Sequence, residues 1–163
     1  MINSGRYVND SMGRYIGKKV VKKIISQGKN ILGAHVLVMG MTFKENVSDI
    51  RNSKVADIIN EFKDFGAEVD VMDPFASPFE VLQEYGIRLV ERPGKKYDAV
   101  VVAVAHTTYL KLDESYFMSI TNEHAVLADV KGVYRGRIHQ MIYWSLSVSY
   151  THLRAHETLM NLV

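Results

Sequence analysis

The sequence has 163 residues, of which 47% are hydrophobic and 23% charged, and a formal net charge of +2. These values suit one globular domain with some extension, and so small a charge does not indicate nucleic-acid binding. The sequence has no cysteine, which excludes disulfides, thiolate metal sites and cysteine nucleophiles within it. It contains no apolar run of about 18–20 residues and opens with no secretory signal, so we expect no membrane contact and a cytoplasmic location.

The first predicted element is a long helix over residues 3–28, along which apolar residues recur at close to helical spacing. A lysine run in its second half is interpreted as a solvated face, with a nucleic-acid or membrane patch as the alternative. The apolar stripe is longer than one small sheet can cover. We therefore expect this helix to pack against a second copy or to project from the domain.

Beyond this helix, short apolar runs alternate with amphipathic segments. Strands are predicted at 35–39, 68–72, 99–104 and 125–128, with a further short one at 87–90, and helices at 53–65, 78–85 and 113–120. This alternation predicts an α/β fold, a Rossmann-like doubly wound parallel sheet preceded by a long helix. The run at 99–104 is the most apolar and should be the central strand.

The loop that follows the first predicted strand carries two cations, Lys44 and Arg51. In a parallel sheet the loops after the strands meet at the carboxyl edge, where open α/β sheets bind ligands. His106 and Lys131 also follow strands, so this edge would gather a set of side chains that suits phosphate groups. The sequence lacks both the G-x-G-x-x-G fingerprint and the phosphate loop, so a solvated loop remains the alternative.

Two further positions have a structural and a functional interpretation. Asp73 ends the second predicted strand before Pro74, where it could bind a ribose as the acidic residue of a Rossmann unit does, or could form a turn. His106 could contact a ligand or could be only a loop residue. Both alternatives stay open at the level of the sequence.

Residues 147–163 match no element of this fold and are expected to be a non-native or disordered tail. Within them, His152 and His156 stand beside Glu157 with the spacing of half a metal site. No third ligand is apparent, so we expect no metal.

Several segments of the sequence resemble the UDP-glucose/GDP-mannose dehydrogenase family. They are residues 5–12, 40–46, 49–53, 73–74 and 129–133, and their order and spacing fit over about residues 4–145. Residues 7–10 and 43–46, together with His106, are most similar to the UDP-N-acetylhexosamine 6-dehydrogenases of bacterial surface-polysaccharide synthesis, the Vi-antigen type.

The resemblance implies a division of the chain and a reaction. Family members have an N-terminal Rossmann domain for NAD, a central helix and a C-terminal domain that binds the UDP-sugar. Residues 1–30 would be the end of the central helix, through which a homodimer forms, and residues 31–146 the Rossmann-like UDP-sugar-binding domain. Such enzymes oxidise the sugar C6 hydroxyl to a carboxylate in two NAD-dependent steps, through a thiohemiacetal on a cysteine.

The resemblance also implies roles for individual residues. Phe43, Lys44 and Lys131 match positions that contact the UDP-sugar substrate, and Arg51 matches an arginine that reaches the NAD pyrophosphate across the domain cleft. The cysteine nucleophile and the G-x-G-x-x-G domain are absent. We therefore expect a C-terminal fragment of a dehydrogenase, with no catalytic residue of its own and no activity alone. The alternative is a stand-alone nucleotide-binding or dimerisation module.

Overall fold

A computed structural model of the protein describes residues 4–146, and residues 4–10 by their backbone alone. The elements in chain order are α1 (Ser4–Ser26), β1 (His35–Met39), α2 (Val55–Asp64), β2 (Glu68–Met72), α3 (Pro78–Tyr85), β3 (Tyr97–Val102), the 3-10 helix η1 (Thr107–Lys111), α4 (Glu114–Ser119), β4 (Thr121–Asp129) and β5 (Ile142–Trp144). All neighbouring strands are parallel, in the order β2-β1-β3-β4-β5. The predicted α/β fold with a parallel sheet and a long leading helix is confirmed.

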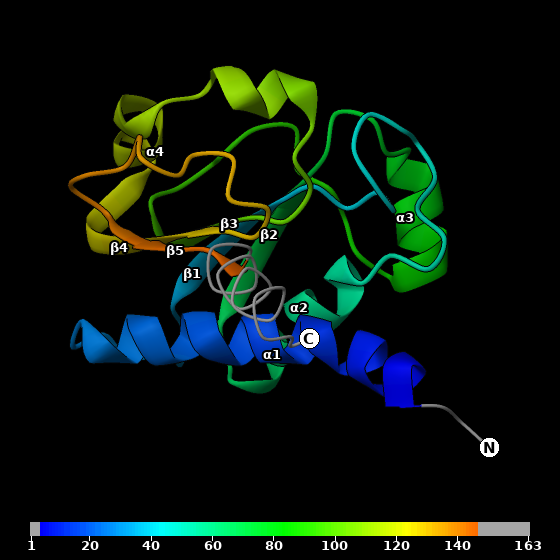
Figure 1. The fold of residues 1–163 in the computed structure, drawn as a ribbon, viewed down its shortest axis with the longest axis horizontal. Helices are drawn as coiled ribbons and strands as arrows, with labels where there is room; N and C mark the ends of the chain where they lie inside the picture. The colour runs from blue at the N-terminus through cyan, green and yellow to red at the C-terminus, as the bar shows by residue number, and fades with distance from the viewer. Residues whose placement is uncertain (1–3, 147–163) are drawn as a thin grey trace, which may run out of the picture.

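Helices cover both faces of the sheet, as Figure 1 shows with α1 and α2 below it and α4 above. Val36 and Val38 of β1 face α1 and α2, whereas Leu37 and Met39 of the same strand face η1 and α4. Successive side chains of a strand point to opposite faces, so a strand covered on both sides must be apolar throughout. The structure therefore confirms the doubly wound arrangement and the central position of β3.

The sheet differs from the prediction at its two edges. Residues 87–90 form no strand, and only Leu89 pairs with β2, in an isolated bridge to Val71. The Arg92-Pro93-Gly94 turn then carries the chain away from this edge. At the other edge, β5 pairs with β4 but was not predicted, because its three half-buried residues are too short for a recognisable pattern.

The leading helix α1 packs on its own domain through its second half. Ile16, Val20, Val21 and Ile24 are buried in the core that α1 shares with α2 and the sheet. No helix among residues 4–146 combines the length and the apolar character that crossing a bilayer requires. From Ile16 to Ile24 the helix α1 does not project from the domain, because its own core covers this part of the apolar stripe.

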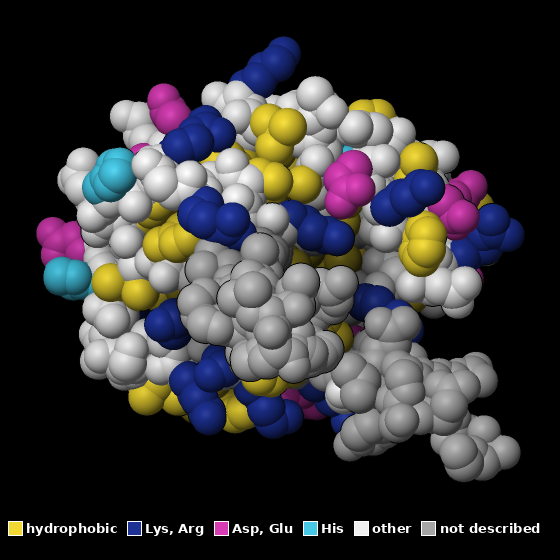
Figure 2. Space-filling view, viewed as in Figure 1, with side chains coloured by type: hydrophobic (Ala, Val, Ile, Leu, Met, Phe, Trp, Pro, Cys, Tyr) yellow, Lys and Arg dark blue, Asp and Glu magenta, His cyan; other side chains and the backbone are white. Residues whose placement is uncertain are grey.

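One side of α1 nevertheless remains exposed. Tyr15 and Ile25 are 45% and 50% exposed, and Lys18 and Lys22 lie between them along the helix. Figure 2 shows Lys and Arg side chains beside hydrophobic ones along this lower edge of the molecule. The homodimer stays a prediction, for which this mixed face is the available surface.

Two glycines set the distance between α1 and α2. A Cβ at position 13 would lie 2.6 Å from Asp57 Cβ and 2.8 Å from the Lys54 carbonyl oxygen. A Cβ at position 17 would lie 2.7 Å from Glu61 Cβ. Only residues without a side chain permit this approach. The Gly13-x-x-x-Gly17 spacing places both on the face of α1 that meets α2.

We expect Gly13→Ala to destabilise the domain by about 1–3 kcal/mol, because the added methyl group must push α2 away from α1. This net loss should appear although alanine improves intrinsic helix stability by about 1 kcal/mol. Urea unfolding followed by circular dichroism measures the change. Gly94→Ala is the matched control, because a Cβ there meets nothing within 4 Å; equal stability of the two variants would contradict the close-approach argument.

Candidate functional site

The loop after β1, residues 40–54, runs against the chain that follows β3. Gly40 closes β1 with φ of +103°, and a Cβ there would lie 2.6 Å from Val104 Cβ and 2.8 Å from the Val104 nitrogen. Both the backbone conformation and the contact therefore require glycine. This approach brings the ends of β1 and β3 together at the carboxyl edge of the sheet.

A buried carboxylate fixes the start of this loop. Asp73 Oδ2 accepts hydrogen bonds from the N–H groups of Met41 (2.6 Å) and Thr42 (3.1 Å) and from His106 Nε2 (3.0 Å). Its Oδ1 accepts from the N–H groups of Phe75 (2.7 Å) and Ala76 (3.2 Å). One side chain thus ties together the segments that follow β1, β2 and β3.

The surroundings of Asp73 keep it ionised. Burial by itself raises the pKa of the Asp73 carboxyl, but the hydrogen bonds from His106, Met41 and Phe75 outweigh it and hold the pKa below its usual range. The side chains of Asp73 and His106 are both fully buried. Neither can meet a ligand, so the structure favours the turn interpretation of Asp73 over the ribose interpretation, and a structural role for His106.

His106 also anchors the middle of the loop through Asn46. The Asn46 N–H donates to His106 Nδ1 at 2.9 Å, so this nitrogen carries no proton and the ring proton lies on Nε2, facing Asp73. The Asn46 side chain makes two further hydrogen bonds with Thr107, of 2.8 and 2.9 Å. Asn46 adopts φ of +60°, which asparagine tolerates better than most residues. Phe43 and Lys44 therefore lie between two fixed points of the loop, the backbone bound by Asp73 and the backbone bound by His106.

A second carboxylate shapes the turn after β4. The buried Asp129 accepts hydrogen bonds from the N–H groups of Val133 (3.0 Å) and Tyr134 (2.7 Å) and from the Tyr143 hydroxyl (2.6 Å). The turn holds Lys131 at the carboxyl edge, where its ammonium lies 3.9 Å from Glu45 of the loop after β1. The loops after β1 and β4 therefore meet across the end of β3.

These loops and α1 enclose a crevice of about 240 Å³. Its lining includes Phe43 and Lys131, two of the predicted substrate residues, together with Asn52, Lys54 and residues of α1 and α2. The Phe43 side chain is 55% exposed, so an aromatic surface stands next to ammonium groups. An aromatic face with nearby cations can accept a planar ring that carries negative groups.

The other two predicted cations lie on the same loop but outside the crevice. Lys44 is exposed and forms no side-chain hydrogen bond or ion pair with any residue between 11 and 146. Arg51 lines a separate hollow beside Glu80 and Glu84, and its guanidinium binds both oxygens of Asp49, at 3.0 and 3.1 Å. These bonds from Arg51 lower the pKa of Asp49 to about 2. The structure thus places only part of the predicted set in one cavity.

Several residues of this site were missed by reasoning from the sequence. Asn46 positions the loop, whereas Asn52 and Lys54 line the crevice. For Asn46 a signal was present, because asparagine in a polar loop is a common residue for a left-handed backbone. Lys54 falls within the helix predicted at 53–65, and nothing in its local pattern indicates that it faces a cavity.

Among the described residues no three His, Asp or Glu side chains converge as a metal site would require. The half-site considered at His152, His156 and Glu157 lies outside the described residues, as does the whole expected tail at 147–163.

Comparison with known proteins gives consistent matches. Residues 37–136 match the model of the UDP-glucose/GDP-mannose dehydrogenase family, UDP binding domain. The chain is 38% identical to the UDP-N-acetyl-D-glucosamine 6-dehydrogenase of Salmonella typhi, over 82% of this chain and 32% of that protein. It is 39% identical to the enzyme of the same name from Pseudomonas aeruginosa, over 80% of this chain and 31% of that protein.

A solved structure supports the same relationship. The UDP-N-acetyl-mannosamine dehydrogenase Cap5O from Staphylococcus aureus superposes with a TM-score of 0.68 at 26% identity, covering 90% of this chain and 33% of that one. The chain spans about a third of the length of the curated relatives it matches. The similarity therefore concerns one part of those larger proteins.

We expect Asp73→Asn to destabilise the domain by about 3–5 kcal/mol at pH 7, because buried donors around the carboxylate lose their acceptor. The folded-state pKa lies below the unfolded value of about 3.9, so this stabilisation is fully present above about pH 4 and is lost as the pH falls further. The difference in unfolding free energy between wild type and Asp73→Asn should therefore become smaller below pH 4. Denaturant unfolding at several pH values measures it.

Asp64→Asn is the control for this series, because Asp64 is an exposed carboxylate at the end of α2. It should change the unfolding free energy by no more than about 0.5 kcal/mol. If the difference in unfolding free energy between Asp73→Asn and wild type is the same at pH 3 and pH 7, the assignment of an ionised, stabilising carboxylate is wrong.

Proposed function

Because the chain belongs to the UDP-glucose/GDP-mannose dehydrogenase family, we propose that it is the UDP-sugar-binding part of a nucleotide-sugar 6-dehydrogenase for surface-polysaccharide precursors. The observation that carries this proposal is the crevice at the carboxyl edge. Phe43 and Lys131 line it, and both lie within the matched residues 37–136. In the parent enzyme, NAD would oxidise the C6 hydroxyl of the bound sugar to a carboxylate.

In this proposal residues 31–146 are the UDP-sugar-binding domain and residues 1–30 the end of a central helix. The exposed Tyr15 and Ile25 on α1 support a homodimer contact along that helix, because about half of the surface of each remains uncovered, 45% and 50%. The lysines between them would lie at the border of such a contact, where charged side chains remain hydrated.

Three side chains would share the recognition of the UDP-sugar. The exposed ring of Phe43 offers a face on which a uracil can stack. Lys44 has an ammonium group without an ion pair among the described residues, so a diphosphate would meet a cation that needs no rearrangement. Lys131 already faces Glu45, so it would contribute less net attraction. Lys44 is therefore the position where loss of charge should matter most.

Arg51 would serve the cofactor instead of the sugar nucleotide. Its side chain is 80% exposed and lies outside the crevice, so a pyrophosphate held by another domain could reach it. Binding there would exchange the carboxylate of Asp49 for the phosphate oxygens. NAD supplies the hydride acceptor when it is bound. This chain would contribute Arg51 to its orientation, because the sequence holds no glycine fingerprint for the dinucleotide.

We expect Lys44→Ala to weaken UDP binding roughly tenfold to a hundredfold, because one charge-assisted hydrogen bond to the diphosphate contributes on the order of 1.5–3 kcal/mol. Calorimetric titration of the chain with UDP measures the dissociation constant. Lys111→Ala removes the same charge from η1 and should leave UDP binding unchanged.

Arg51→Ala should barely change the affinity of this chain for UDP, since its proposed partner is NAD. In the full-length enzyme the same change should raise the concentration of NAD needed for half-maximal rate. A larger loss of UDP affinity at Arg51 than at Lys44 would show that the two cations are assigned wrongly.

A nucleotide-binding or dimerisation module without catalysis is the second candidate, favoured by the absence of cysteine. A reaction through a thiohemiacetal needs a thiolate, which this sequence cannot supply. The purified chain should therefore produce no NADH from NAD with UDP-glucose or a UDP-N-acetylhexosamine, measured by absorbance at saturating substrate. Turnover that rises in proportion to the concentration of the chain would overturn the proposal.

A further inference from the structure

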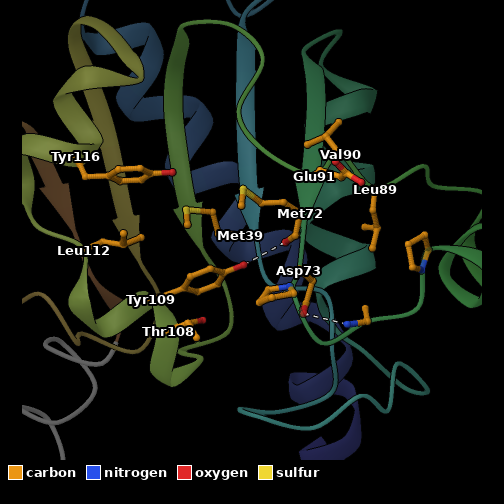
Figure 3. A pocket seen from close by; sticks show the side chains of 13 residues that line it. Met39, Met72, Asp73, Leu89, Val90, Glu91, Thr108, Tyr109, Leu112 and Tyr116 are labelled. Atoms are coloured by element: carbon orange, nitrogen blue, oxygen red, sulfur yellow. Dashed lines mark hydrogen bonds between the residues drawn. The ribbon is translucent and has the colours of Figure 1, made fainter.

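A second cavity, of about 520 Å³, opens on the other face of the sheet (Figure 3). Its floor is formed by Met39 at the end of β1 and Met72 at the end of β2. It shares no lining residue with the crevice that holds Phe43 and Lys131, and the sheet lies between the two. The chain leaves β1 toward β2 and leaves the neighbouring β3 toward β4, in opposite directions, and ligands of open α/β sheets bind at such a switch point.

The walls of this cavity suit a flat ring. Figure 3 shows Tyr109 and Tyr116 on one side, with their hydroxyl groups directed across the opening, and Leu89 and Val90 on the other. The Tyr109 ring is held against His106, with centroids 5.5 Å apart, and its hydroxyl lies 3.5 Å from the Met72 carbonyl oxygen. Aromatic and thioether groups around a slot make favourable contacts with planar rings.

The charges around the cavity argue against a phosphate. No lysine or arginine between residues 11 and 146 lines it, and the two carboxylates of this part of the chain that do are the buried Asp73 and the rim residue Glu91. Asp73 is fully engaged with protein donors, so only Glu91 is available to a ligand. An anion would meet a like charge and no compensating cation.

Two polar groups face each other across this apolar slot. The Tyr116 hydroxyl makes no hydrogen bond with any residue between 11 and 146, and burial raises its pKa, so it remains a neutral donor. The Glu91 carboxylate, which Figure 3 shows on the opposite wall, can only accept. A ring nitrogen that accepts and an exocyclic amino group that donates would satisfy both.

We propose that this cavity binds an amino-bearing nucleobase, of the adenine class, with its sugar toward solvent and no phosphate inside the cavity. The adenine ring lies between the two tyrosines and the aliphatic wall. A ring nitrogen accepts from Tyr116, and the exocyclic amino group donates to Glu91. Uracil matches this pattern less well, because its only free ring donor, N3–H, lies between two carbonyl oxygens that the Glu91 carboxylate would repel. The proposal does not depend on the UDP-sugar site.

Adenosine is the probe for the test, because it carries the ring without a phosphate. Calorimetric titration and saturation-transfer NMR of the wild-type chain should give a dissociation constant on the order of 0.1–1 mM. Uridine should bind at least roughly fivefold more weakly, and inorganic pyrophosphate should not compete with adenosine. Saturating UDP should leave adenosine binding unchanged, which separates this cavity from the crevice.

Tyr116→Phe keeps the ring and the packing and removes only the hydroxyl, so it should weaken adenosine binding roughly threefold to tenfold. Glu91→Gln, at an exposed position, should reduce the preference for adenosine over uridine. Lys44→Ala, on the loop after β1, should bind adenosine like wild type. Normal circular dichroism of each variant confirms that the fold is retained.

Other results would overturn the proposal. One such result is the absence of binding at about 5 mM adenosine, and another is equal affinity for adenosine and uridine. Displacement of adenosine by UDP, or an unchanged dissociation constant for adenosine in Tyr116→Phe, would also overturn it. Light scattering that shows a dimer through this face, with the cavity closed to adenosine, would assign the surface to a second copy of the chain. Loss of UDP binding with adenosine binding intact would count against the proposed function alone.

Discussion

The Asp73 carboxylate is the constraint on which the carboxyl edge depends. It lies at the end of β2, yet the backbone donors it holds belong to the loop after β1 and to its own turn, and its histidine partner follows β3. A charge can remain buried only when several hydrogen bonds replace its lost hydration. Because the replacements come from three segments, each segment is fixed relative to the others. His106 extends the same network to Asn46 and so to the residues that carry the predicted substrate contacts.

The helix α1 serves the core and the crevice at once. Its glycines at 13 and 17 allow α2 to approach closely, while Met12, Gly13 and Ile16 also line the crevice beside Phe43. A change in the angle between α1 and α2 would therefore change the width of the proposed UDP site. This coupling gives a physical reason why a helix outside the sheet can affect the proposed UDP site.

Two cations of the site are partly neutralised by carboxylates of the loop after β1. Asp49 binds Arg51 and Glu45 faces Lys131, whereas Lys44 has no such partner among residues 11–146. Exposed ion pairs contribute little to stability, so a phosphate could replace either carboxylate at a small cost. The opposite face has a different character, because the described residues around its cavity include tyrosines and methionines but no lysine or arginine. One sheet thus separates the surface that we propose to bind the anionic substrate from an apolar slot.

The sequence by itself determined the fold class, the order and boundaries of most elements, and the family. Apolar runs such as Val36–Val38 and Ala99–Val102 must be buried on both faces, and burial on both faces is what a parallel sheet provides. Local pattern failed for β5, whose half-buried residues are too few to show a period. It also left Asp73 and His106 undecided, because the partners of a buried polar group come from distant segments. Only the tertiary structure showed that Asp73 and His106 bind each other, that Arg51 lies outside the crevice, and that Lys131 faces Glu45. Each of these arrangements depends on the distance between loops that are far apart in the sequence and that the sheet brings together.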